Sequence, residues 1–452
     1  MLPIVSPAEM RVIDASATEP VEVLIEQAGA AVARAAARLM GTCYGKRVVV
    51  IAGKGNNGAD GKVAARRLAE RGAQVTVLDA ADLPDAVPPC DLVIDAAYGT
   101  GFRGEWAPPD VGGALVLAVD IPSGVDGLTG QCGPGVLPAD ATVTFAALKP
   151  GLLFPPGSTF TGALEVVDIG LDTSMVRTHL VQHADVTEWV PPRDANAHKW
   201  RSAVWVVAGS GGMLGAARLA AASAHRAGAG MVWLSSPGAG VDPLAPTEVV
   251  NRPLPSQGWA SELLVAADRF KALVVGPGMG RAEVTATQIR ELVAQTALAT
   301  VVDGDGLFAL AWSGDGAGPL LRARRGPTVL TPHDGEYALL AGTRVGVDRI
   351  AAARELAEAT AAVELLKGPA TVVAEPTGAV RVVTAGDERL ATAGTGDVLA
   401  GIIGGLLACG VPAFEAAAAG AWIHGQAARR GPARGLVAGD LVGLIPAVLE
   451  TL

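Results

Sequence analysis

Short apolar runs alternate with amphipathic segments along the first part of the chain. Apolar runs lie at Val48–Ala52, Val75–Leu78, Leu92–Ile94, Leu115–Val119, Thr142–Phe145 and Leu164–Ile169. Such continuous runs are typical of strands that are buried on both faces of a parallel sheet. Two helix patterns, Glu9–Ala17 and the alanine-rich Val21–Met40, precede them. The alternation predicts a doubly wound α/β domain.

A second α/β series follows a break in the pattern. The proline-containing segment Val190–Asp194 cannot continue a regular element and predicts a linker. Further strands are expected at Ala203–Ala208, Met231–Leu234, Leu273–Val275, Thr300–Val302, Thr328–Leu330, Val363–Leu366 and Thr371–Ala374. Two apolar helices, Asp397–Ala408 and Phe414–Arg430, close the series. We therefore expect two domains, 1–187 and 196–452, joined by a linker at 188–195, as a length of 452 residues also favours.

Composition and charge exclude several classes of function. The chain has 35 basic and 45 acidic side chains, which argues against nucleic-acid binding. Its four cysteines are scattered without a Cys-x-x-Cys pair, so neither a disulfide framework nor a zinc site is expected. The first residues lack a signal-peptide pattern, and the longest uncharged run, Val398–Phe414, is too short to span a membrane. We expect a soluble, cytoplasmic protein.

A glycine-dense turn, Gly53–Gly61, lies between a predicted strand and a predicted helix. Its glycines let backbone N–H groups approach an anionic ligand closely. The spacing is neither that of the dinucleotide motif Gly-x-Gly-x-x-Gly nor that of a Walker loop. An ordinary turn would explain two glycines, but not four together with the pair Asn56 and Asn57. The turn therefore indicates a ligand site.

Two other predicted strands end in an aspartate that opens a glycine-rich loop. These loops are Asp95–Gly104 and Asp120–Gly127. Ligands of doubly wound sheets bind beyond the carboxyl ends of the strands. Either aspartate alone would more often cap a helix, but both together with the asparagine pair indicate a site for a hard cation with oxygen ligands. Lys149 follows another strand, and alone it would be interpreted as a solvated lysine.

Four motifs, GKGNNGADG, DAAYGTGFRG, VDIPSGVDG and ALKPGL, make Met1–Leu171 resemble the NAD(P)HX epimerase family. The resemblance implies a Rossmann-like domain that binds hydrated NADH or NADPH, which carries a hydroxyl on carbon 6 of the nicotinamide ring. Members of this family interconvert the R and S epimers at that carbon and bind potassium. By position, the potassium ligands would be Asn57, Asp95 and Ser123.

The same resemblance implies which residues contact the hydrate. They are Asn56, Asn57, Gly58, Ala59, Asp60, Gly99, Thr100, Gly101, Phe102, Arg103, Gly104, Glu105 and Asp120. Ala59 replaces the usual glycine, which is tolerable if its φ is negative. For proton transfer, Asp120 is the better candidate for a base, with Lys149 assisting.

A second candidate site opens the first apolar helix at Ala393–Gly401. Gly394 and Gly396 permit a turn lined by amides, and a helix N-terminus carries about half an elementary positive charge, so a phosphoryl group would fit. Asp397 in the first turn is either an ordinary helix-capping acid or a base that accepts a proton from a substrate hydroxyl. Further loops at strand ends, which carry His333 and Lys367, favour the second interpretation.

The motifs AGS, GPGMG, LTPHDGE, LKGPAT and AGTGDVLAG make Asn196–Leu452 resemble the ribokinase-like NAD(P)HX dehydratases. The resemblance implies dehydration of the S epimer at the expense of ADP, which gives AMP and phosphate, with magnesium on the nucleotide. The hydrate contacts would be Ala216, Gly278, His333 and Asp397, of which Asp397 activates the ring hydroxyl. The nucleotide contacts would be Lys367, Gly368, Pro369, Ala370, Thr371, Gly394, Thr395 and Gly396. Trp200 replaces a frequent glycine, and we expect it to cover the domain edge rather than to stack on a ligand.

The sequence thus predicts a bifunctional nicotinamide-nucleotide repair enzyme, expected to be a homo-oligomer without nucleic-acid or membrane partners. Two alternatives stay open. In one, the second domain is a small-molecule kinase of the same superfamily. In the other, the first domain is a non-catalytic binding module, for which Ala59 offers a reason.

Overall fold

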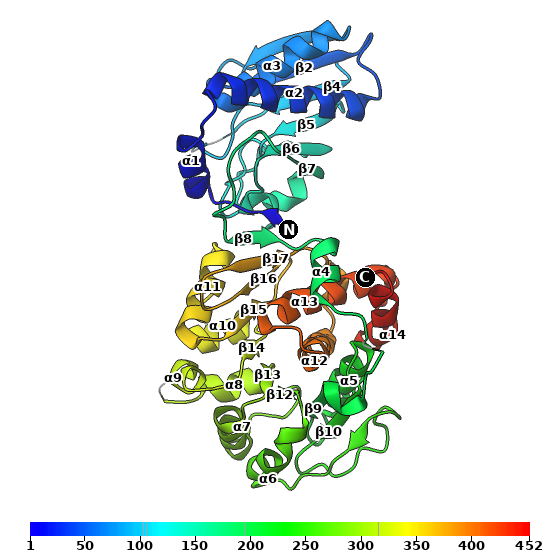
Figure 1. Ribbon diagram of the computed structural model, residues 1–452. Coiled ribbons are helices and arrows are strands. Elements are labelled where there is room, and N and C mark those ends of the chain that lie inside the picture. The colour runs from blue at the N-terminus through cyan, green and yellow to red at the C-terminus, as the bar shows by residue number, and fades with distance from the viewer. Residues whose placement is uncertain (103, 105, 194, 315) are drawn as a thin grey trace. The chain divides into compact units, whose positions relative to one another are not determined.

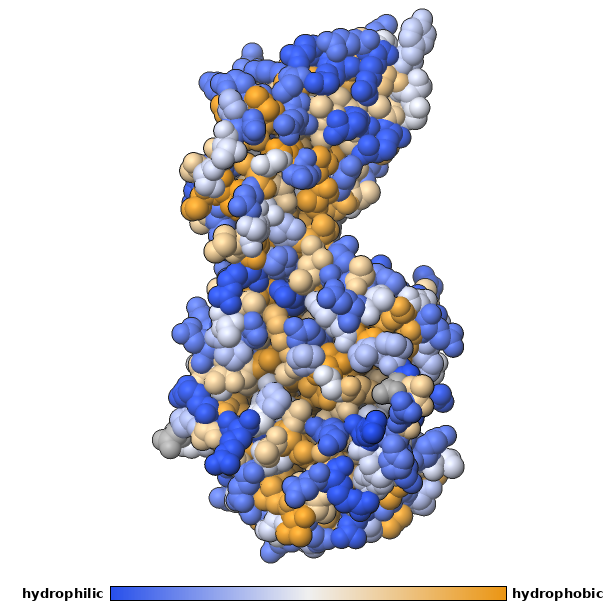
Figure 2. Space-filling view, in the orientation of Figure 1, coloured by the Kyte–Doolittle hydropathy of each residue, from blue (hydrophilic) through white to orange (hydrophobic). Residues whose placement is uncertain are grey.

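The computed structural model describes residues 1–452 except positions 103, 105, 194 and 315 (Figure 1). The chain separates into two compact units, Leu2–Thr178 and His179–Leu452, and Met1 belongs with the second. On the face shown in Figure 2, hydrophilic side chains cover most of each unit, with small apolar patches between them. None of the described helices combines the length and apolar character that a bilayer crossing requires.

The first unit is built on a parallel sheet in the order β3-β2-β4-β5-β6-β7 (Figure 1). Its strands are β2 (Arg47–Ala52), β3 (Gln74–Asp79), β4 (Leu92–Ala96), β5 (Leu115–Val119), β6 (Ala141–Phe145) and β7 (Ala163–Val167). The chain leaves β2 toward β3 on one side and continues to β4 on the other, which makes the carboxyl ends of β2 and β4 a topological switch point. The expected doubly wound α/β domain, a Rossmann-like sheet, is confirmed.

Three helices complete the first unit: α1 (Pro7–Ala15), α2 (Val21–Met40) and α3 (Asn56–Glu70). Helices α2 and α3 pack closely because Gly29 has no side chain, and a Cβ there would lie 2.4 Å from Cβ of Val63. The expected start of α1 at Glu9 is wrong. Ser6 caps the helix, since its Oγ accepts from Glu9 N at 3.1 Å while Glu9 Oε2 accepts from Ser6 N at 2.7 Å.

Burial of the strands differs from the expectation at both edges of the sheet, where neither β3 nor β7 has a fully buried residue. Strands β2, β4, β5 and β6 are largely buried, as expected. Strands β3 and β7 are more exposed because they form the two edges of the sheet.

The second unit is built on a larger sheet in the order β8-β17-β16-β15-β14-β13-β12-β9-β10-β11. The strands are β8 (Thr178–Leu180), β9 (Ala203–Val207), β10 (Met231–Ser235), β11 (Val250–Asn251), β12 (Ala272–Val275), β13 (Ala299–Val302), β14 (Thr328–Leu330), β15 (Val363–Leu366), β16 (Thr371–Ala374) and β17 (Val380–Val383). Pairing is parallel from β11 to β15 and antiparallel from β15 through β16 to β17.

Helices cover both faces of this sheet. They are α4 (His183–Trp189), α5 (Leu214–Arg226), α6 (Trp259–Ala266), α7 (Glu283–Gln295), α8 (Asp305–Ala311), α9 (Ala317–Arg322), α10 (Asp334–Ala341), α11 (Arg349–Thr360), α12 (Thr395–Ala408), α13 (Ala413–Arg430) and α14 (Ala438–Leu449). Val274 of β12 joins the core on the side of α5 and α12, whereas Leu273 and Val275 join the core on the side of α6 and α7. The result is the α/β/α layering expected for this half.

Helix α12 lies deep in this unit because its glycines admit α5. A Cβ on Gly401 would lie 2.2 Å from Ala220 O, and one on Gly405 would lie 2.7 Å from Ala224 O. The close contact fixes the N-terminus of α12, which carries the second candidate site.

The boundary between the two units lies earlier in the chain than expected. Residues 179–187, which we placed in the first domain, belong to the second unit. Helix α4 packs on α13 there, and the rings of His183 and Trp422 lie 5.5 Å apart. Between Trp189 and Lys199, the described residues form no helix or strand.

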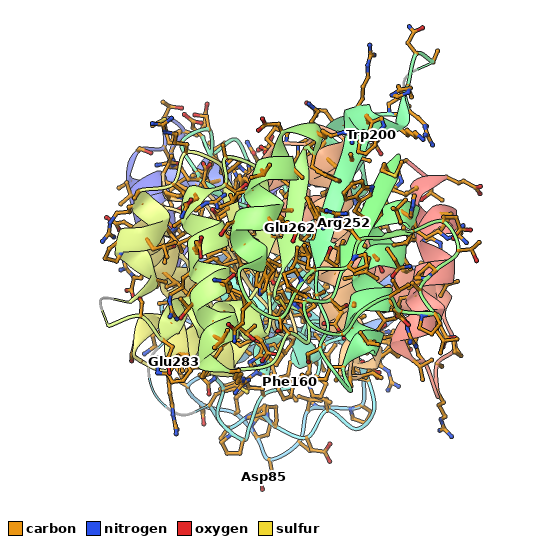
Figure 3. The ribbon with its side chains drawn as sticks, turned by 90° about the horizontal axis from the view of Figure 1, so that it is seen from below. Asp85, Phe160, Trp200, Arg252, Glu262 and Glu283 are labelled. Atoms are coloured by element: carbon orange, nitrogen blue, oxygen red, sulfur yellow. The ribbon has the colours of Figure 1, made fainter. Side chains whose placement is uncertain are left out.

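Trp200 lies in a short 3-10 helix, Lys199–Ser202, directly before β9, at the edge of the second unit (Figure 3). Its ring packs edge-on against Trp233 at 6.1 Å and Phe270 at 5.8 Å. The Arg269 guanidinium lies 4.0 Å above it. Trp200 therefore closes an aromatic cluster at the domain edge, as expected.

Candidate active sites

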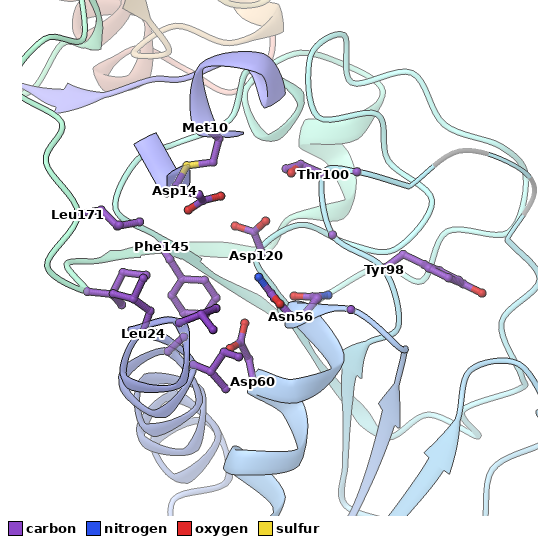
Figure 4. A pocket seen from close by; sticks show the side chains of 18 of the residues that line it. Met10, Asp14, Leu24, Asn56, Asp60, Tyr98, Thr100, Asp120, Phe145 and Leu171 are labelled. Atoms are coloured by element: carbon purple, nitrogen blue, oxygen red, sulfur yellow. The ribbon is translucent and has the colours of Figure 1, made fainter. Parts of the chain in front are cut away.

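The first unit holds a cavity of about 930 Å³ beyond the carboxyl ends of β4, β5 and β6 (Figure 4). Helices α1 and α2 form one wall, and the start of α3 forms another. The residues that line it are Met10, Asp14, Ala17, Glu19, Val21, Leu24, Ile25, Ala28, Lys54, Gly55, Asn56, Asn57, Asp60, Ala97, Tyr98, Gly99, Thr100, Gly101, Phe102, Asp120, Phe145, Lys149, Ile169 and Leu171. This volume is at the upper end for small-molecule sites.

Asp120 and Lys149 form an ion pair in this cavity. Lys149 Nζ donates to Asp120 Oδ1 at 2.5 Å, to Thr144 Oγ1 at 2.8 Å and to Phe145 O at 3.2 Å. Thr144 Oγ1 in turn donates to Asp120 Oδ1 at 3.0 Å. Lys149 is 1% exposed, so it is not the solvated lysine that its sequence context alone suggests. Such charge-assisted bonds fix the position of the Asp120 side chain in the cavity.

Two further carboxyl groups line the cavity. Burial, and next the charge of Asp120, raise the pKa of Asp60 to about 8. Burial also raises the pKa of Asp14, which Lys149 partly counteracts. No role was predicted for Asp14 from the sequence, although Met10 and Asp14 lie one turn apart on α1 and both face the cavity.

Asp95 and Ser123 form a buried cluster beneath the cavity. Ser123 donates to Asp95 through Oγ at 2.6 Å and through its amide at 2.9 Å. Tyr98 N donates to Ser123 Oγ at 2.9 Å. Burial raises the pKa of Asp95, against these hydrogen bonds. The Asn57 side chain is also buried, and neither its Oδ1 nor its Nδ2 has a partner among the described residues.

These three residues fit a monovalent cation. All three supply oxygen atoms, and the carbonyl oxygen of Asn57 lacks any other partner in the described part of the chain. A bound cation would satisfy that oxygen and offset the buried negative charge of Asp95.

The remaining expected residues of the first site divide into three groups. Asn56, Gly99, Thr100, Gly101 and Phe102 line the cavity, whereas Gly58, Ala59 and Gly104 are not among the described residues that do so. Arg103 and Glu105 lie outside the described residues. Gly58 serves the turn itself, because a Cβ there would lie 1.9 Å from Gly53 O. Ala59 lies within α3, where φ is negative, which meets the condition for alanine.

The second site centres on Lys367, which follows β15. Its Nζ lies 3.0 Å from Asp303 Oδ1 and 3.6 Å from Glu336 Oε2. Burial opposes its positive charge, but the attraction of Asp303 and Glu336 outweighs burial and raises the pKa of Lys367. Thr331 Oγ1 also donates to Asp303 Oδ1 at 2.7 Å. Lys367 is therefore a fixed cation near the carboxyl ends of β13, β14 and β15.

Asp397 lies in the first turn of α12, close to this cluster. Burial, and next the negative charge of Asp303, raise its pKa to about 7, although Lys367 partly counteracts them. Gly394, with φ of 90°, forms the turn before it, as a glycine can without strain. A Cβ on Gly396 would lie 3.5 Å from Lys367 Nζ. The structure thus brings Gly394, Gly396, Asp397 and Lys367 together, as expected.

His333 caps α10 rather than pointing both ring nitrogens at a ligand. Its Nδ1 accepts from Gly335 N at 3.0 Å and from Glu336 N at 3.2 Å. The proton of the neutral ring is therefore on Nε2, which lies 3.6 Å from Glu336 Oε2, and the side chain as a whole is 61% exposed. The other expected hydrate contacts, Ala216 and Gly278, are neighbours, since a Cβ on Gly278 would lie 2.9 Å from Ala216 Cβ.

The expected nucleotide segment, Lys367–Thr371, forms the turn between β15 and β16. Arg349 supports it, because its Nη2 donates to Lys367 O at 2.8 Å and the guanidinium pairs with both oxygens of Asp334. A Cβ on Gly368 would lie 2.6 Å from Arg349 Nη2. Thr395 turns inward, and its Oγ1 donates to Leu390 O at 2.8 Å. The sequence did not assign roles to Arg349, Asp303 or Glu336, which lie far from Lys367 along the chain.

Family models match both halves of the chain. The model described as NAD(P)H-hydrate dehydratase matches residues 204–446, and the model described as YjeF-related protein N-terminus matches residues 21–88 and 78–151. The bifunctional NAD(P)H-hydrate repair enzyme Nnr of Moorella thermoacetica is 37% identical, over 99% of this chain and 97% of the relative. The chain belongs to the bifunctional NAD(P)H-hydrate repair enzymes. The Mycobacterium leprae member is 38% identical, over 86% of this chain and 84% of its own length.

A solved structure confirms the fold of the second half of this repair enzyme. A ribokinase-like superfamily protein from Enterococcus faecalis V583 superposes with a TM-score of 0.51. The alignment covers 62% of this chain and 98% of that protein at 18% identity, so it bears on the fold alone.

Proposed function

We propose that the two units of this repair enzyme carry out two consecutive steps on one damaged cofactor. The first unit interconverts the R and S hydrates of NADH and NADPH, and the second dehydrates the S hydrate with conversion of ADP to AMP and phosphate. The observation that carries the proposal is the pair of separate sites, each with a lysine that is paired with an aspartate beside glycine-rich turns. A non-catalytic first unit would not need the buried pair of Asp120 and Lys149 in its cavity.

In the dehydratase site, Asp397 removes the proton of the ring hydroxyl while the hydroxyl oxygen attacks the β-phosphorus of ADP. AMP leaves, and the phosphorylated oxygen becomes a far better leaving group than hydroxide. The lone pair of the ring nitrogen then expels phosphate, and loss of a proton from carbon 5 restores the double bond of the dihydropyridine. Lys367, with its raised pKa, stays cationic and neutralises phosphoryl charge during the transfer.

We assign the hydrate contacts of this site to Ala216, Gly278, His333 and Asp397. The Nε2–H of His333 donates to the hydrate, while its Nδ1 holds α10. The nucleotide contacts are the segment Lys367–Thr371 and the turn Gly394–Gly396, whose amides face phosphate at the start of α12. Magnesium bound to the nucleotide would neutralise further phosphate charge.

In the epimerase site, we assign potassium to Asn57, Asp95 and Ser123. The carbonyl oxygen of Asn57, which has no partner among the described residues, and the buried carboxyl of Asp95 support a cation there. Potassium would supply positive charge beside the anionic groups of the hydrate, and Asp120 would act as the base.

Asp397→Asn tests the division of labour. We expect the variant to lose ADP-dependent dehydration by at least about a hundredfold, the low end of what a general base contributes. Exchange between the R and S hydrates should continue at the wild-type rate, because the epimerase cavity lies in the other unit. Chromatography of the two epimers with and without ADP measures both activities. Normal dehydration by the variant would refute the role of Asp397.

A further inference from the structure

Asp60 is a buried carboxyl group in the epimerase cavity without a hydrogen-bond partner among the described residues. It projects from α3 and is 6% exposed, and no described residue donates a hydrogen bond to its carboxyl group. Carboxyl groups in this degree of burial are normally bonded or paired. Figure 4 shows its oxygens facing the cavity rather than the protein core. Its free oxygens are thus available to a ligand.

The surroundings of Asp60 favour its neutral form. The wall that α2 presents is apolar and includes Leu24, Ile25 and Ala28. The charged groups that line the rest of the cavity are Asp14 of α1, Glu19 before α2, Lys54 before α3, Asp120 after β5 and Lys149 after β6. Burial and the charge of Asp120 raise the pKa of Asp60 to about 8, so it carries a proton at neutral pH.

Asp120 has the opposite surroundings in the same cavity. Lys149 donates to its Oδ1 at 2.5 Å and Thr144 donates to the same oxygen at 3.0 Å, so this carboxyl group faces a cation and a hydroxyl donor. One cavity therefore contains a proton donor from α3 and a proton acceptor from the end of β5. Two carboxyl groups with opposite protonation are the arrangement that general acid–base catalysis requires.

We propose that Asp60 is a second catalytic residue of the epimerase, which protonates the hydroxyl that leaves carbon 6 while Asp120 deprotonates the water that replaces it. This inference rests on the proposed epimerase function. It assigns a proton-transfer role to a residue that was expected only to contact the hydrate.

The step balances in protons and electrons. The bond between carbon 6 and oxygen breaks as Asp60 gives its proton to that oxygen, and water leaves. The lone pair of the ring nitrogen forms a double bond to carbon 6, which gives a cation. Water adds to the other face of carbon 6, the nitrogen regains its lone pair, and Asp120 takes the released proton. Asp60 is then ionised and Asp120 protonated, which is the state that catalyses the reverse conversion.

Asp60→Asn in the full-length enzyme tests this role. Without ADP the dehydratase is silent, so chromatography follows the exchange of R and S hydrates of NADH alone. We expect the variant to lose at least about a hundredfold in kcat. KM should change by less than about threefold, because the asparagine keeps the size and polarity of the side chain. Glu70→Gln removes a charge from the exposed end of the same helix and is the matched control, with wild-type exchange.

The pH profile separates a catalytic role from a structural one. Asp60 must carry its proton, so wild-type exchange should fall as the pH rises through about 8. Asp60→Glu should restore part of the activity together with that alkaline decrease. In water enriched in oxygen-18, the label should enter the hydroxyl of carbon 6 as fast as the epimers exchange.

Three results would overturn the role of Asp60. These are exchange by Asp60→Asn within a few-fold of the wild type, a loss confined to KM, or exchange without entry of oxygen-18. A thermal unfolding transition of the first unit that stays at the wild-type temperature reports that the Asp60→Asn variant is folded, because Asp60 lies in that unit. If the wild-type enzyme itself showed no exchange, the proposed epimerase function would fall, which is a different outcome from exchange that persists in the variant.

Discussion

Three aspartates show how their surroundings assign different chemistry to one side chain. Asp120 has a buried lysine at 2.5 Å and acts as a carboxylate. Asp60 has an apolar wall and a negative neighbour, and its pKa is raised to about 8. Asp397 lies between them, since burial and Asp303 raise its pKa to about 7. The surroundings of all three aspartates are formed by residues that are distant in the sequence.

The pKa of Asp397 predicts the pH dependence of dehydration. As a base, Asp397 must be ionised, so kcat/KM for ADP-dependent dehydration should rise as the pH increases through about 7 and then reach a plateau. Initial rates with saturating ADP between pH 6 and 9 measure this. Epimer exchange in the same preparation is the control, since it should fall at the alkaline end. A dehydration rate that stays constant between pH 6 and 8 would contradict the assignment.

The ion pair in the epimerase cavity predicts a coupling between two substitutions. Asp120→Asn leaves Lys149 buried and unpaired, which should destabilise the first unit by about 3 kcal/mol. Lys149→Met in addition should recover most of that loss, because the uncompensated charge is gone. Asparagine also tolerates the positive φ of 67° at position 120.

Thermal unfolding of the wild type, both single variants and the double variant gives the coupling energy. Additive losses would show that the pair contributes nothing. Neither Asp120→Asn nor the double variant should exchange the epimers.

At the scale of elements, the sequence predicted most of the strands but did not predict every strand and helix. Buried strands such as β5, β14 and β15 have the predicted bounds, because a continuous apolar run is a strong signal. Strand β17 and helix α14 were missed. Strand β17 is a short run after a turn, and α14 contains Pro446, which argues against a helix in a sequence pattern.

The sites were predicted only as far as local motifs reach. The glycine turns and the residues in them could be recognised, because each turn is continuous in the chain. The partners Asp303 and Glu336 of Lys367, and Asp14 of the epimerase cavity, come together only through the fold. No local pattern distinguishes them from other acidic residues.

Strand β15 carries an uncompensated carboxyl group. Glu364 is fully buried, neither of its oxygens has a partner among the described residues, and burial raises its pKa well above the ordinary value. Its proton is retained in the folded state but released in the unfolded state above about pH 4.5. The stability of the second unit should therefore decrease as the pH rises from 4.5 toward the raised pKa.

Glu364→Gln should remove this loss. The melting temperature of the variant should exceed that of the wild type by an increasing margin as the pH rises from 5 to 8. Near pH 4.5 the two melting temperatures should be equal. Calorimetry at a series of pH values measures the difference. Glu355→Gln, on the neighbouring helix α11, is a control that should show no such trend. A difference that is independent of pH would contradict a neutral Glu364.

At the scale of the whole molecule, each unit has its own core and its own site. The epimerase cavity is lined entirely by residues of Leu2–Thr178, and the Lys367 cluster lies entirely within His179–Leu452. Each activity should therefore be removable without the other. Joining them in one chain lets a dehydratase that accepts only the S hydrate clear both epimers.

The most direct test supplies an equal mixture of R and S hydrates of NADH with excess ADP and follows the absorbance of the NADH formed. The wild type should convert the whole mixture, Asp120→Asn should stop near half of it within the same time, and Asp397→Asn should form none. Complete conversion by Asp120→Asn at the wild-type rate would contradict the account, because the R hydrate would then need no epimerase.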